Sequence, residues 1–392
     1  MYFPLEIWEH IFLYADPVVL TNLKTVCKDW NEIIAKILKD NDHWHKLCKK
    51  EIPNHLWSTL CETLNPKKFY NEFDGKHDAM MWMAMYKLWF KSKNVVQWST
   101  QSKYIEPLLK QSPVESITCM DTSGNLLAVG TSEGYIYFYN ISRLYEGSIY
   151  TADHMEYVHS VQFIRDETNI VCISCSINNH ISFWDVKSKK LIGKTRGELI
   201  CTSYSYCYTA MHNAIVTEGS IPRTVYEFNT NKIIAVGADN NKVHFYTEEG
   251  HFVHLKLDTG KEIYVTWTCV PLPNIKVRRY YIFKPHMAVC ITENGYIGFL
   301  HDKEWKLHNL FPILHGTPTT VLVYAHLLIV GLNSGNVHVY YIKDFETINF
   351  NTMDSKKLTF DTTAVISLNI MVHIEEFLIV SYGTKIYITK FT

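Results

Sequence analysis

The chain has 392 residues, of which 47% are hydrophobic and 20% are charged, and its formal net charge is −1. This is the composition of a folded globular protein, which excludes extensive disorder, and the length leaves room for two domains. A nearly neutral protein also lacks an overall field that would recruit nucleic acid or an anionic membrane.

The start of the chain lacks the features of a signal peptide, and no run approaches the roughly 18 apolar residues of a membrane span. The ten cysteines have no framework spacing. We therefore expect free thiols and a cytoplasmic and/or nuclear location. Cys172 and Cys175 lie three apart in a predicted strand, where their side chains point to opposite faces, so they are not expected to share a metal.

Residues 3–92 have the apolar periodicity of helices. Spacing of three and four residues in Leu5–Phe12 predicts a first amphipathic helix. Asp16-Pro17 is an N-cap followed by a proline at the first helical position, which opens a second short helix. A third helix is predicted from about Lys24 to Leu38. Its apolar residues cover more than one face, which indicates a further surface for packing.

This helical region resembles an F-box. The resemblance rests on a proline-leucine start, an isoleucine-phenylalanine pair, a leucine-rich middle, a valine-cysteine-x-x-tryptophan motif and a trailing tryptophan. In order, these are Pro4-Leu5, Ile11-Phe12, Leu20 with Leu23, Val26-Cys27-Lys28-Asp29-Trp30, and Trp44. The departure is Tyr14-Ala15-Asp16, which stands where a leucine-bearing turn is usual.

The resemblance implies that these helices bind the Skp-type adaptor of a cullin–RING ubiquitin ligase. The surplus apolar surface would then be covered by a partner. The adaptor-binding residues it implies are Pro4, Leu5, Ile7, Ile11, Leu20, Val26 and Trp30. The alternative is a small helical domain packed against the rest of its own chain.

A methionine-rich helical stretch follows at Asp78–Phe90. It is apolar on too many sides for a surface helix. Such a stretch can form an adaptable binding groove, but we expect a core helix.

From Val95 onward the period changes to two, and one unit recurs: an apolar strand, a tight polar turn and a second strand with aromatic or β-branched alternation. Residues 95–392 divide into seven units of about 43 residues, the length of a four-stranded propeller blade, or into six of about 50. Seven is favoured and six remains possible, because the strands of Leu199–Leu257 do not parse uniquely. The cleanest copies are Asn125–Ile141, Asn169–Val186, Lys232–Gly250, Met287–Asp302 and Leu327–Ile342.

These units resemble WD repeats. Trp184-Asp185 is the only literal Trp-Asp dipeptide, and the same position elsewhere is read as Tyr139-Asn140, Tyr246-Thr247, Leu300-His301 and Tyr340-Tyr341. The family's Asp–His–Ser/Thr–Trp tetrad is therefore expected to be missing from most blades. A strand near Val95–Ser99 or Tyr104–Leu109 is expected to complete the last blade, since closure removes exposed edges.

The predicted fold class is thus α+β multidomain. A small all-α F-box head at residues 1–48 and a helical linker at 49–94 precede an all-β, WD-repeat-like β-propeller at 95–392.

The chain carries no glycine-rich phosphate loop, no Gly-x-Ser-x-Gly elbow and no His-Glu-x-x-His motif. His154 with His159, and His251 with His254, have spacings that place partners on opposite faces of a strand. We expect no catalytic residue, no metal and no cofactor. A propeller enzyme would need converging acid, base or metal groups in its channel.

Some F-box propellers bind phosphorylated segments through arginines on the rim. The candidate target-binding residues here are Arg196, Arg223, Arg278, Arg279 and Tyr280. Lys276–Tyr281 also mixes basic and aromatic side chains as a nucleic-acid patch would, but a protein-binding rim is favoured.

The function implied is a non-catalytic substrate-recognition subunit of an SCF-type E3 ubiquitin ligase, with the F-box on the adaptor and the propeller on the target protein. The alternative is a non-degradative F-box/propeller scaffold that organises a protein complex. Neither nucleic acid nor membrane is an expected partner.

Overall fold

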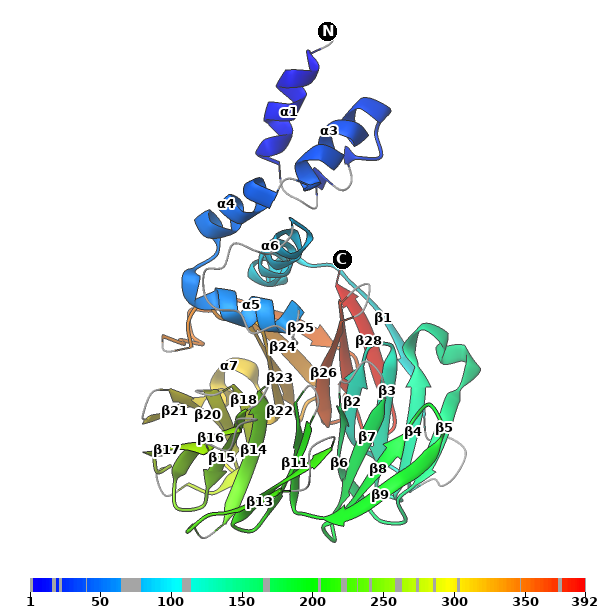
Figure 1. Cartoon of the computed structure of the whole chain (residues 1–392), viewed down its shortest axis with the longest axis vertical. Helices are drawn as coiled ribbons and strands as arrows, with labels where there is room; N and C mark the ends of the chain where they lie inside the picture. Colours follow the sequence, from blue (N-terminus) through cyan, green and yellow to red (C-terminus); the bar gives the residue numbers. More distant parts are fainter. Residues whose placement is uncertain are drawn as a thin grey trace. The chain divides into compact units, whose positions relative to one another are not determined.

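The computed structural model divides the chain into two compact units, Met1–Val95 with Tyr324–Leu327 and Val96–Val323 with Leu328–Thr392 (Figure 1). It describes all residues except 1–2, 16–18, 21–22, 40, 65–78, 108–113, 165–169, 204–205, 220–223, 231, 240–241, 258–262, 273–274, 285–286, 302–303, 346, 373–375 and 392. Among the helices described, none has the length and apolarity needed to span a membrane.

The first unit is helical. Its described elements are α1 (Leu5–Leu13), α3 (Lys28–Lys39), α4 (Asn41–Glu51), η1 (Asn54–Leu56), α5 (Trp57–Leu64) and α6 (Ala79–Lys93), with η2 (Val95–Gln97) at the change of unit. The predicted start of a second helix at Asp16-Pro17 lies outside the described residues.

Helix α1 begins directly after Pro4, whose carbonyl accepts hydrogen bonds from the amides of Ile7 and Trp8 at 3.1 and 3.4 Å. Helix α3 begins later than the predicted Lys24, since Cys27 precedes its first turn and its sulfur accepts the amide of Trp30 at 3.5 Å. A side-chain acceptor at this position satisfies an amide that the helix leaves free, which fixes where the helix begins.

The core of the helical unit is aromatic. The Trp30 ring packs 4.6 Å from that of Trp8 and 5.1 Å from that of Phe12. Helix α6 buries Trp82, Met85 and other large side chains in the same cluster. The prediction that the methionine-rich stretch is core is therefore confirmed for Trp82, Met85, Tyr86, Leu88 and Trp89, whereas Met80 is exposed.

The second unit consists of seven four-stranded antiparallel sheets, so the prediction of seven blades is confirmed. First strands of neighbouring sheets contact one another, as β2 does with β6 and β26. In sheet order the strands are β2 (Ile117–Ser123), β3 (Leu126–Thr131), β4 (Tyr135–Asn140), β5 (Ser148–Asp153); β6 (Val158–Ile164), β7 (Val171–Ser176), β8 (His180–Asp185), β9 (Lys190–Arg196); β10 (Leu199–Thr202), β11 (Tyr206–Met211), β12 (Ala214–Gly219), β13 (Thr224–Glu227); β14 (Ile233–Asp239), β15 (Lys242–Thr247), β16 (His251–Leu257), β17 (Ile263–Cys269); β18 (Val277–Lys284), β19 (Met287–Thr292), β20 (Tyr296–His301), β21 (Glu304–Asn309); β22 (Pro318–Tyr324), β23 (Leu327–Leu332), β24 (Asn336–Tyr341), β25 (Ser355–Thr359); and β26 (Ser367–Val372), β27 (Glu376–Ser381), β28 (Ile386–Phe391), β1 (Thr100–Ile105). Two short helical segments, η3 (Ile141–Glu146) and α7 (Phe311–Leu314), lie between strands.

The last blade is completed by the first strand of the unit. Strand β1 pairs antiparallel with β28, from Thr100 opposite Phe391 to Ile105 opposite Ile386. The predicted closure is confirmed. The strand begins directly after the first segment suggested for it, Val95–Ser99, and overlaps the second at Tyr104 and Ile105. This pairing ties the two ends of the unit together and covers the edge of β28, while β1 forms the outer edge of the sheet.

The segment that did not parse from sequence, Leu199–Leu257, contains a complete blade, β10–β13, and the first three strands of the next, β14–β16. The first and last strands of the β10–β13 blade have only four residues each. The repeat unit predicted at Lys232–Gly250 is displaced by one strand. It supplies β14 and β15, the first two strands of its blade, whereas Asn125–Ile141 supplies the second and third. Tyr246-Thr247 therefore does not occupy the Trp-Asp position, because any adjacent hairpin of a blade produces the same alternation.

The blade with the literal Trp-Asp dipeptide keeps part of the tetrad. The Trp184 indole donates to Ser174 Oγ at 2.8 Å, both side chains are buried, and the His154 ring centroid lies 6.5 Å from that of Trp184.

We expect Ser174→Ala to destabilise the propeller by about 1–3 kcal/mol, because the buried indole N–H loses its acceptor. Urea unfolding of the full chain measures this change. The double variant Ser174→Ala with Trp184→Phe should be less destabilised than the sum of the two single variants. If the loss of the double variant equalled the sum of the two single losses, the argument would be contradicted, because Ser174 and Trp184 would then contribute independently to stability.

Candidate binding surfaces

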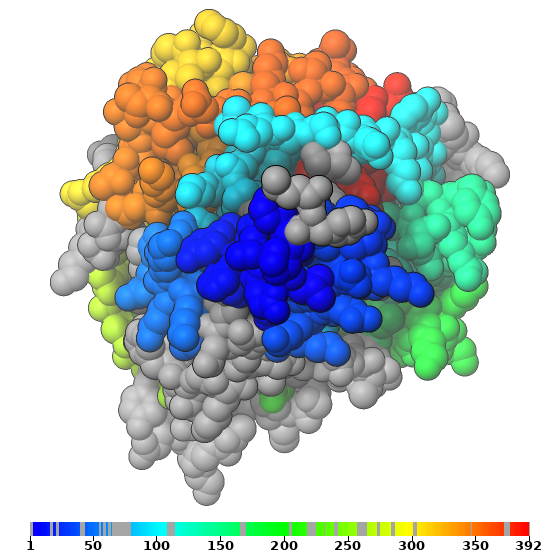
Figure 2. Space-filling model, turned by 90° about the horizontal axis from the view of Figure 1, so that it is seen from above, coloured from blue at the N-terminus to red at the C-terminus, as the bar shows by residue number. Residues whose placement is uncertain are grey.

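The helical unit exposes large apolar side chains close to its N-terminus. Seven of them have exposed fractions between 43% and 90%: Phe3, Leu5, Ile7, Ile11, Tyr14, Val19 and Val26. We call this set the apolar surface of the helical unit. Figure 2 shows the N-terminal residues of this unit in dark blue, on the face turned to the viewer.

Helix α1 has apolar residues on two faces. Trp8 and Phe12 face inward and contact Trp30, while Ile7, Ile11 and Tyr14 follow one another at spacings of four and three residues and remain exposed. A helix that is apolar on both sides of its axis has more apolar area than its own core covers. The outward face is therefore suited to burial against another protein.

The predicted adaptor-binding residues fall into two groups. Pro4, Leu5, Ile7, Ile11 and Val26 are exposed, whereas Leu20 is fully buried and Trp30 is half-buried. Leu20 and Trp30 thus support the surface from within the core.

Phe3, Tyr14 and Val19 were not predicted as members of the apolar surface. For Tyr14 a signal existed, since it continues the spacing of Ile7 and Ile11 along the helix.

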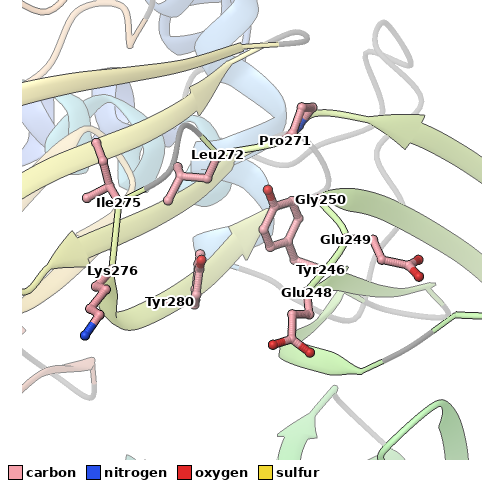
Figure 3. A pocket seen from close by; sticks show the side chains of 9 residues that line it. All are labelled: Tyr246, Glu248, Glu249, Gly250, Pro271, Leu272, Ile275, Lys276 and Tyr280. Carbon is pink, nitrogen blue, oxygen red and sulfur yellow. The ribbon is translucent and has the colours of Figure 1, made fainter.

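The propeller has a pocket of about 500 Å³ between two consecutive blades, β14–β17 and β18–β21 (Figure 3). One wall is the turn between β15 and β16, and the other is formed by Pro271, Leu272, Ile275 and Lys276, which precede β18. We call it the tyrosine pocket. It is lined by Tyr246, Glu248, Glu249, Gly250, Pro271, Leu272, Ile275, Lys276 and Tyr280.

Hydrogen bonds fix the floor of the tyrosine pocket. Tyr246 Oη donates to the carbonyl of Val270 at 2.7 Å and accepts from Trp305 Nε1 at 3.2 Å. The Tyr280 ring lies 5.6 Å from that of Tyr246. Burial raises the pKa of both tyrosine hydroxyls, so both remain neutral near pH 7.

In three blades, the turn between the second and third strands contains the same hydrogen bond from a backbone amide to a threonine hydroxyl. Thr131, Thr247 and Thr292 each accept, through Oγ1, the amide of the residue four positions later, at 2.9–3.1 Å. Glycine with positive φ precedes that residue, for example Gly250 at +87°. Thr247 thereby fixes the turn that carries Glu248 and Glu249.

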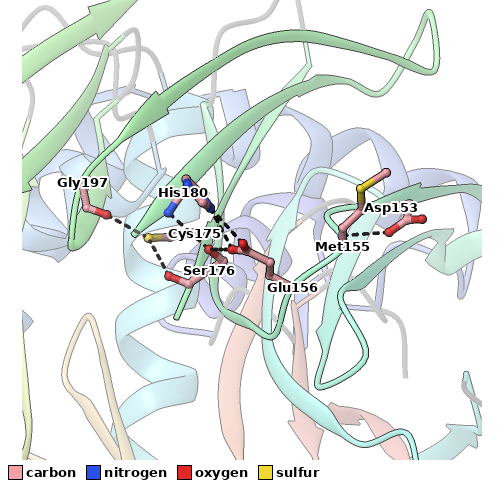
Figure 4. Close-up of polar contacts among 7 residues, drawn as sticks. All are labelled: Asp153, Met155, Glu156, Cys175, Ser176, His180 and Gly197. Atoms are coloured by element: carbon pink, nitrogen blue, oxygen red, sulfur yellow. Dashed lines mark hydrogen bonds and ion pairs between the residues drawn. The ribbon is translucent and has the colours of Figure 1, made fainter. Parts of the chain in front are cut away.

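The corresponding turn of the β6–β9 blade uses Ser176, and it is joined to the preceding connection by Glu156 (Figure 4). The Glu156 carboxylate accepts from Ser176 Oγ and lies 3.0 Å from His180 Nδ1. The serine hydroxyl thus bonds the carboxylate and not the imidazole, which is the arrangement of a cross-link between two loops. The Ser176 hydrogen bond, and then that of His180, hold the pKa of Glu156 at about 2, below its usual 4.5.

A carboxyl group with a lowered folded pKa stabilises the protein above its unfolded pKa, and this contribution disappears as the pH falls toward the folded value. We therefore expect the difference in unfolding free energy between the wild type and Ser176→Ala to be constant above pH 4.5 and to shrink between pH 4.5 and 2. Urea unfolding across this range measures it. A difference that keeps its full size down to pH 2 would contradict the role of Glu156.

The structure does not gather the candidate arginines into one cluster. Arg196 ends β9 opposite His180, whereas Arg278 and Arg279 lie near the start of β18, three sheets further along the chain, and all three are exposed. Arg223 lies outside the described residues. Of the five candidate target-binding residues, Tyr280 is the one that lines the tyrosine pocket.

In the part of the chain that the structure describes, no group of three or more histidine, cysteine, aspartate or glutamate side chains is arranged to hold a metal ion. Burial raises the pKa of the Cys119 thiol to about 12 and also raises that of Cys172. These thiols are therefore protonated core residues near neutral pH.

A family profile described as F-box-like matches residues 3–50. A comparison with curated proteins gives no match. Solved structures similar to this chain include "Crystal structure of RRP9 WD40 repeats", at 12% identity and a TM-score of 0.55, with 74% of this chain and 100% of that chain covered. Another is "Structure of U3-55K", at 12% identity and a TM-score of 0.56, with coverage of 74% and 98%.

At this level of identity, the similarity to the solved structures establishes the fold alone. The chain therefore combines an F-box-like domain at its N-terminus with a seven-bladed β-propeller that resembles WD40-repeat structures, an organisation consistent with an F-box/WD-repeat protein of the substrate-receptor type.

Proposed function

We propose that this protein is the non-catalytic substrate-recognition subunit of an SCF-type cullin–RING ubiquitin ligase. Its F-box-like domain binds a Skp-type adaptor, and its propeller binds the protein to be ubiquitinated. The chain acts by proximity, because holding a target beside the charged conjugating enzyme raises the effective concentration of the target's lysines. The proposed location is cytoplasmic and/or nuclear.

The observation that carries the proposal is the apolar surface of the helical unit. Its seven side chains lie within the region matched by the F-box-like profile, residues 3–50. Several large apolar side chains exposed on one folded domain indicate a site of protein association. Pro4, Leu5, Ile7, Ile11 and Val26 are the proposed direct contacts with the adaptor, with Leu20 and Trp30 holding them in place from the core.

The propeller supports the second half of the proposal. Turns and connections fixed by hydrogen bonds, such as those at Thr247 and Glu156, hold their side chains in set positions before a target arrives. Preorganised loops lose less conformational entropy on binding.

The experiment that tests the function is affinity purification of the full chain from cells, followed by mass spectrometry. The matched bait carries Ile7→Glu and Ile11→Glu. Adaptor and cullin should appear with the wild type and be lost with the variant, whereas proteins recovered with both baits are candidate targets. Absence of the adaptor from the wild-type sample would overturn the proposal. Adaptor without cullin would favour the alternative function, a non-degradative scaffold.

A further inference from the structure

The tyrosine pocket combines an aromatic floor with acidic side chains at its mouth. Tyr246 and Tyr280 form the floor, Leu272 and Ile275 add aliphatic surface, and Glu248 with Glu249 project from the turn between β15 and β16 (Figure 3). A volume of about 500 Å³ is within the range of protein pockets that bind small ligands, so a long side chain fits with part of its backbone.

The polar groups of the tyrosine pocket differ in whether they already bond to another residue of the protein. Glu249 has partners, since its Oε2 lies 3.4 Å from His251 Nδ1 and accepts from Thr230 Oγ1 at 3.4 Å. Glu248 is exposed and forms no ion pair with any residue in the described ranges. Tyr280 Oη likewise makes no hydrogen bond to the described residues, although its ring is half-buried. A carboxylate and a hydroxyl are therefore available to a ligand.

We propose that the tyrosine pocket binds a lysine or arginine side chain of the target protein. This inference rests on the proposed function, because it names the chemistry by which the propeller would recognise its target. The aliphatic stem lies on the Tyr280 ring, which the buried Tyr246 supports from below, and on Leu272, and the positive charge lies at Glu248. Long basic side chains bury their stems on apolar surface while the charged end stays among polar groups, and aromatic faces attract cations.

The charges at the tyrosine pocket disfavour a phosphorylated target. Two carboxylates at the mouth repel a phosphate group, and the exposed arginines Arg278 and Arg279 are not among the lining residues. Lys276 is the one basic residue of the lining. Its ammonium group lowers the affinity for a cation, which makes the site sensitive to replacement of this single residue.

The test measures binding of small probes to the purified full chain by saturation-transfer NMR. The probes are Nα-acetyl-lysinamide, Nα-acetyl-argininamide, the neutral Nα-acetyl-norleucinamide and Nα-acetyl-phosphoserinamide. We expect the two basic probes to bind about fivefold more tightly than the norleucine probe, as one cation–π contact and one ion pair predict. We expect the phosphoserine probe to bind more weakly than either. Equal binding of lysine and norleucine probes, or preference for phosphoserine, would overturn the proposal.

Three variants localise the effect. Glu248→Lys should lower affinity for the basic probes about tenfold, and Lys276→Glu should raise it about threefold, a gain that misfolding cannot produce. The matched control is Glu133→Lys, which reverses the charge of an exposed glutamate in the corresponding turn between β3 and β4, in a blade that contributes no residue to the pocket lining. Unchanged binding in both Glu248→Lys and Lys276→Glu would place the probes elsewhere and refute the assignment.

The outcome is separable from that of the ligase hypothesis. Adaptor binding is measured on the same Glu248→Lys protein and should equal the wild-type value, because the apolar surface belongs to the other unit. Probe binding without adaptor binding would retain the pocket and reject the ligase. Adaptor binding without charge-selective probe binding would reject the pocket proposal and retain the ligase proposal.

Discussion

Replacing Ile7 and Ile11 together by glutamate is expected to lower the affinity for a Skp-type adaptor by about a hundredfold or more. Both side chains are exposed on α1, and burying an isoleucine contributes about 1.5–3 kcal/mol. Since Ile7 and Ile11 are 43% and 46% exposed, covering them contributes about half of that value each, and the two together approach the roughly 2.7 kcal/mol that a hundredfold change requires. The glutamates would also bring charges into an apolar interface, which adds to the loss. Isothermal titration of the purified adaptor into the full chain measures the change.

The helical unit itself should remain folded in this variant. Exposed positions tolerate substitution within about 0.5 kcal/mol, and glutamate is a good helix former. Circular dichroism checks this. The matched control is Met80→Glu, which alters an exposed apolar residue on α6 and should leave adaptor affinity unchanged. Wild-type affinity in a folded Ile7→Glu/Ile11→Glu protein would show that the apolar surface does not bind the adaptor.

Gly335→Ala is expected to be among the most destabilising single substitutions in the propeller, by about 3 kcal/mol or more. Gly335 has φ +82°, where an L side chain costs about 1–2 kcal/mol. An added Cβ would also lie 2.1 Å from the carbonyl oxygen of Asp361, which is backbone and cannot rotate away. The forced shift would disturb the Tyr382 hydroxyl, which donates to the Gly335 carbonyl at 2.7 Å and so connects two neighbouring blades. Urea unfolding followed by fluorescence measures the loss.

Gly124→Ala separates the two causes. Gly124 also has a positive φ, +55°, but nothing lies within 4 Å of its added Cβ. Its variant should lose only the conformational contribution of about 1–2 kcal/mol. Equal losses at the two positions would show that the close contact with Asp361 contributes nothing.

Local patterns were enough to predict the elements. Apolar spacing in Leu5–Phe12 predicted α1, and strand–turn–strand alternation predicted hairpins in the blades other than β10–β13, because both signals come from residues close in the chain. Helix α3 was predicted too early, since its start depends on the Cys27 sulfur accepting an amide, a contact that periodicity does not encode.

Local patterns did not predict which strands of a blade each repeat unit forms. Lys232–Gly250 has the same alternation as Asn125–Ile141, yet it forms the first and second strands of its blade, and Asn125–Ile141 forms the second and third. Adjacent strands in a blade have similar alternation, so only their pairing with neighbouring blades distinguishes them. The order of strands around the propeller was therefore decided by tertiary contacts.

The sequence by itself determined that an apolar, F-box-like helical region precedes a blade-forming region. Both properties follow from composition and from the spacing of apolar residues along the chain. The tertiary structure alone decided which apolar side chains remain outside: Leu5 is exposed and Leu20 fully buried, although both are leucines of the same motif. It also assembled the tyrosine pocket from Tyr246 and Tyr280, which belong to different blades. Burial and proximity across blades depend on packing between distant segments, and no local pattern carries that information.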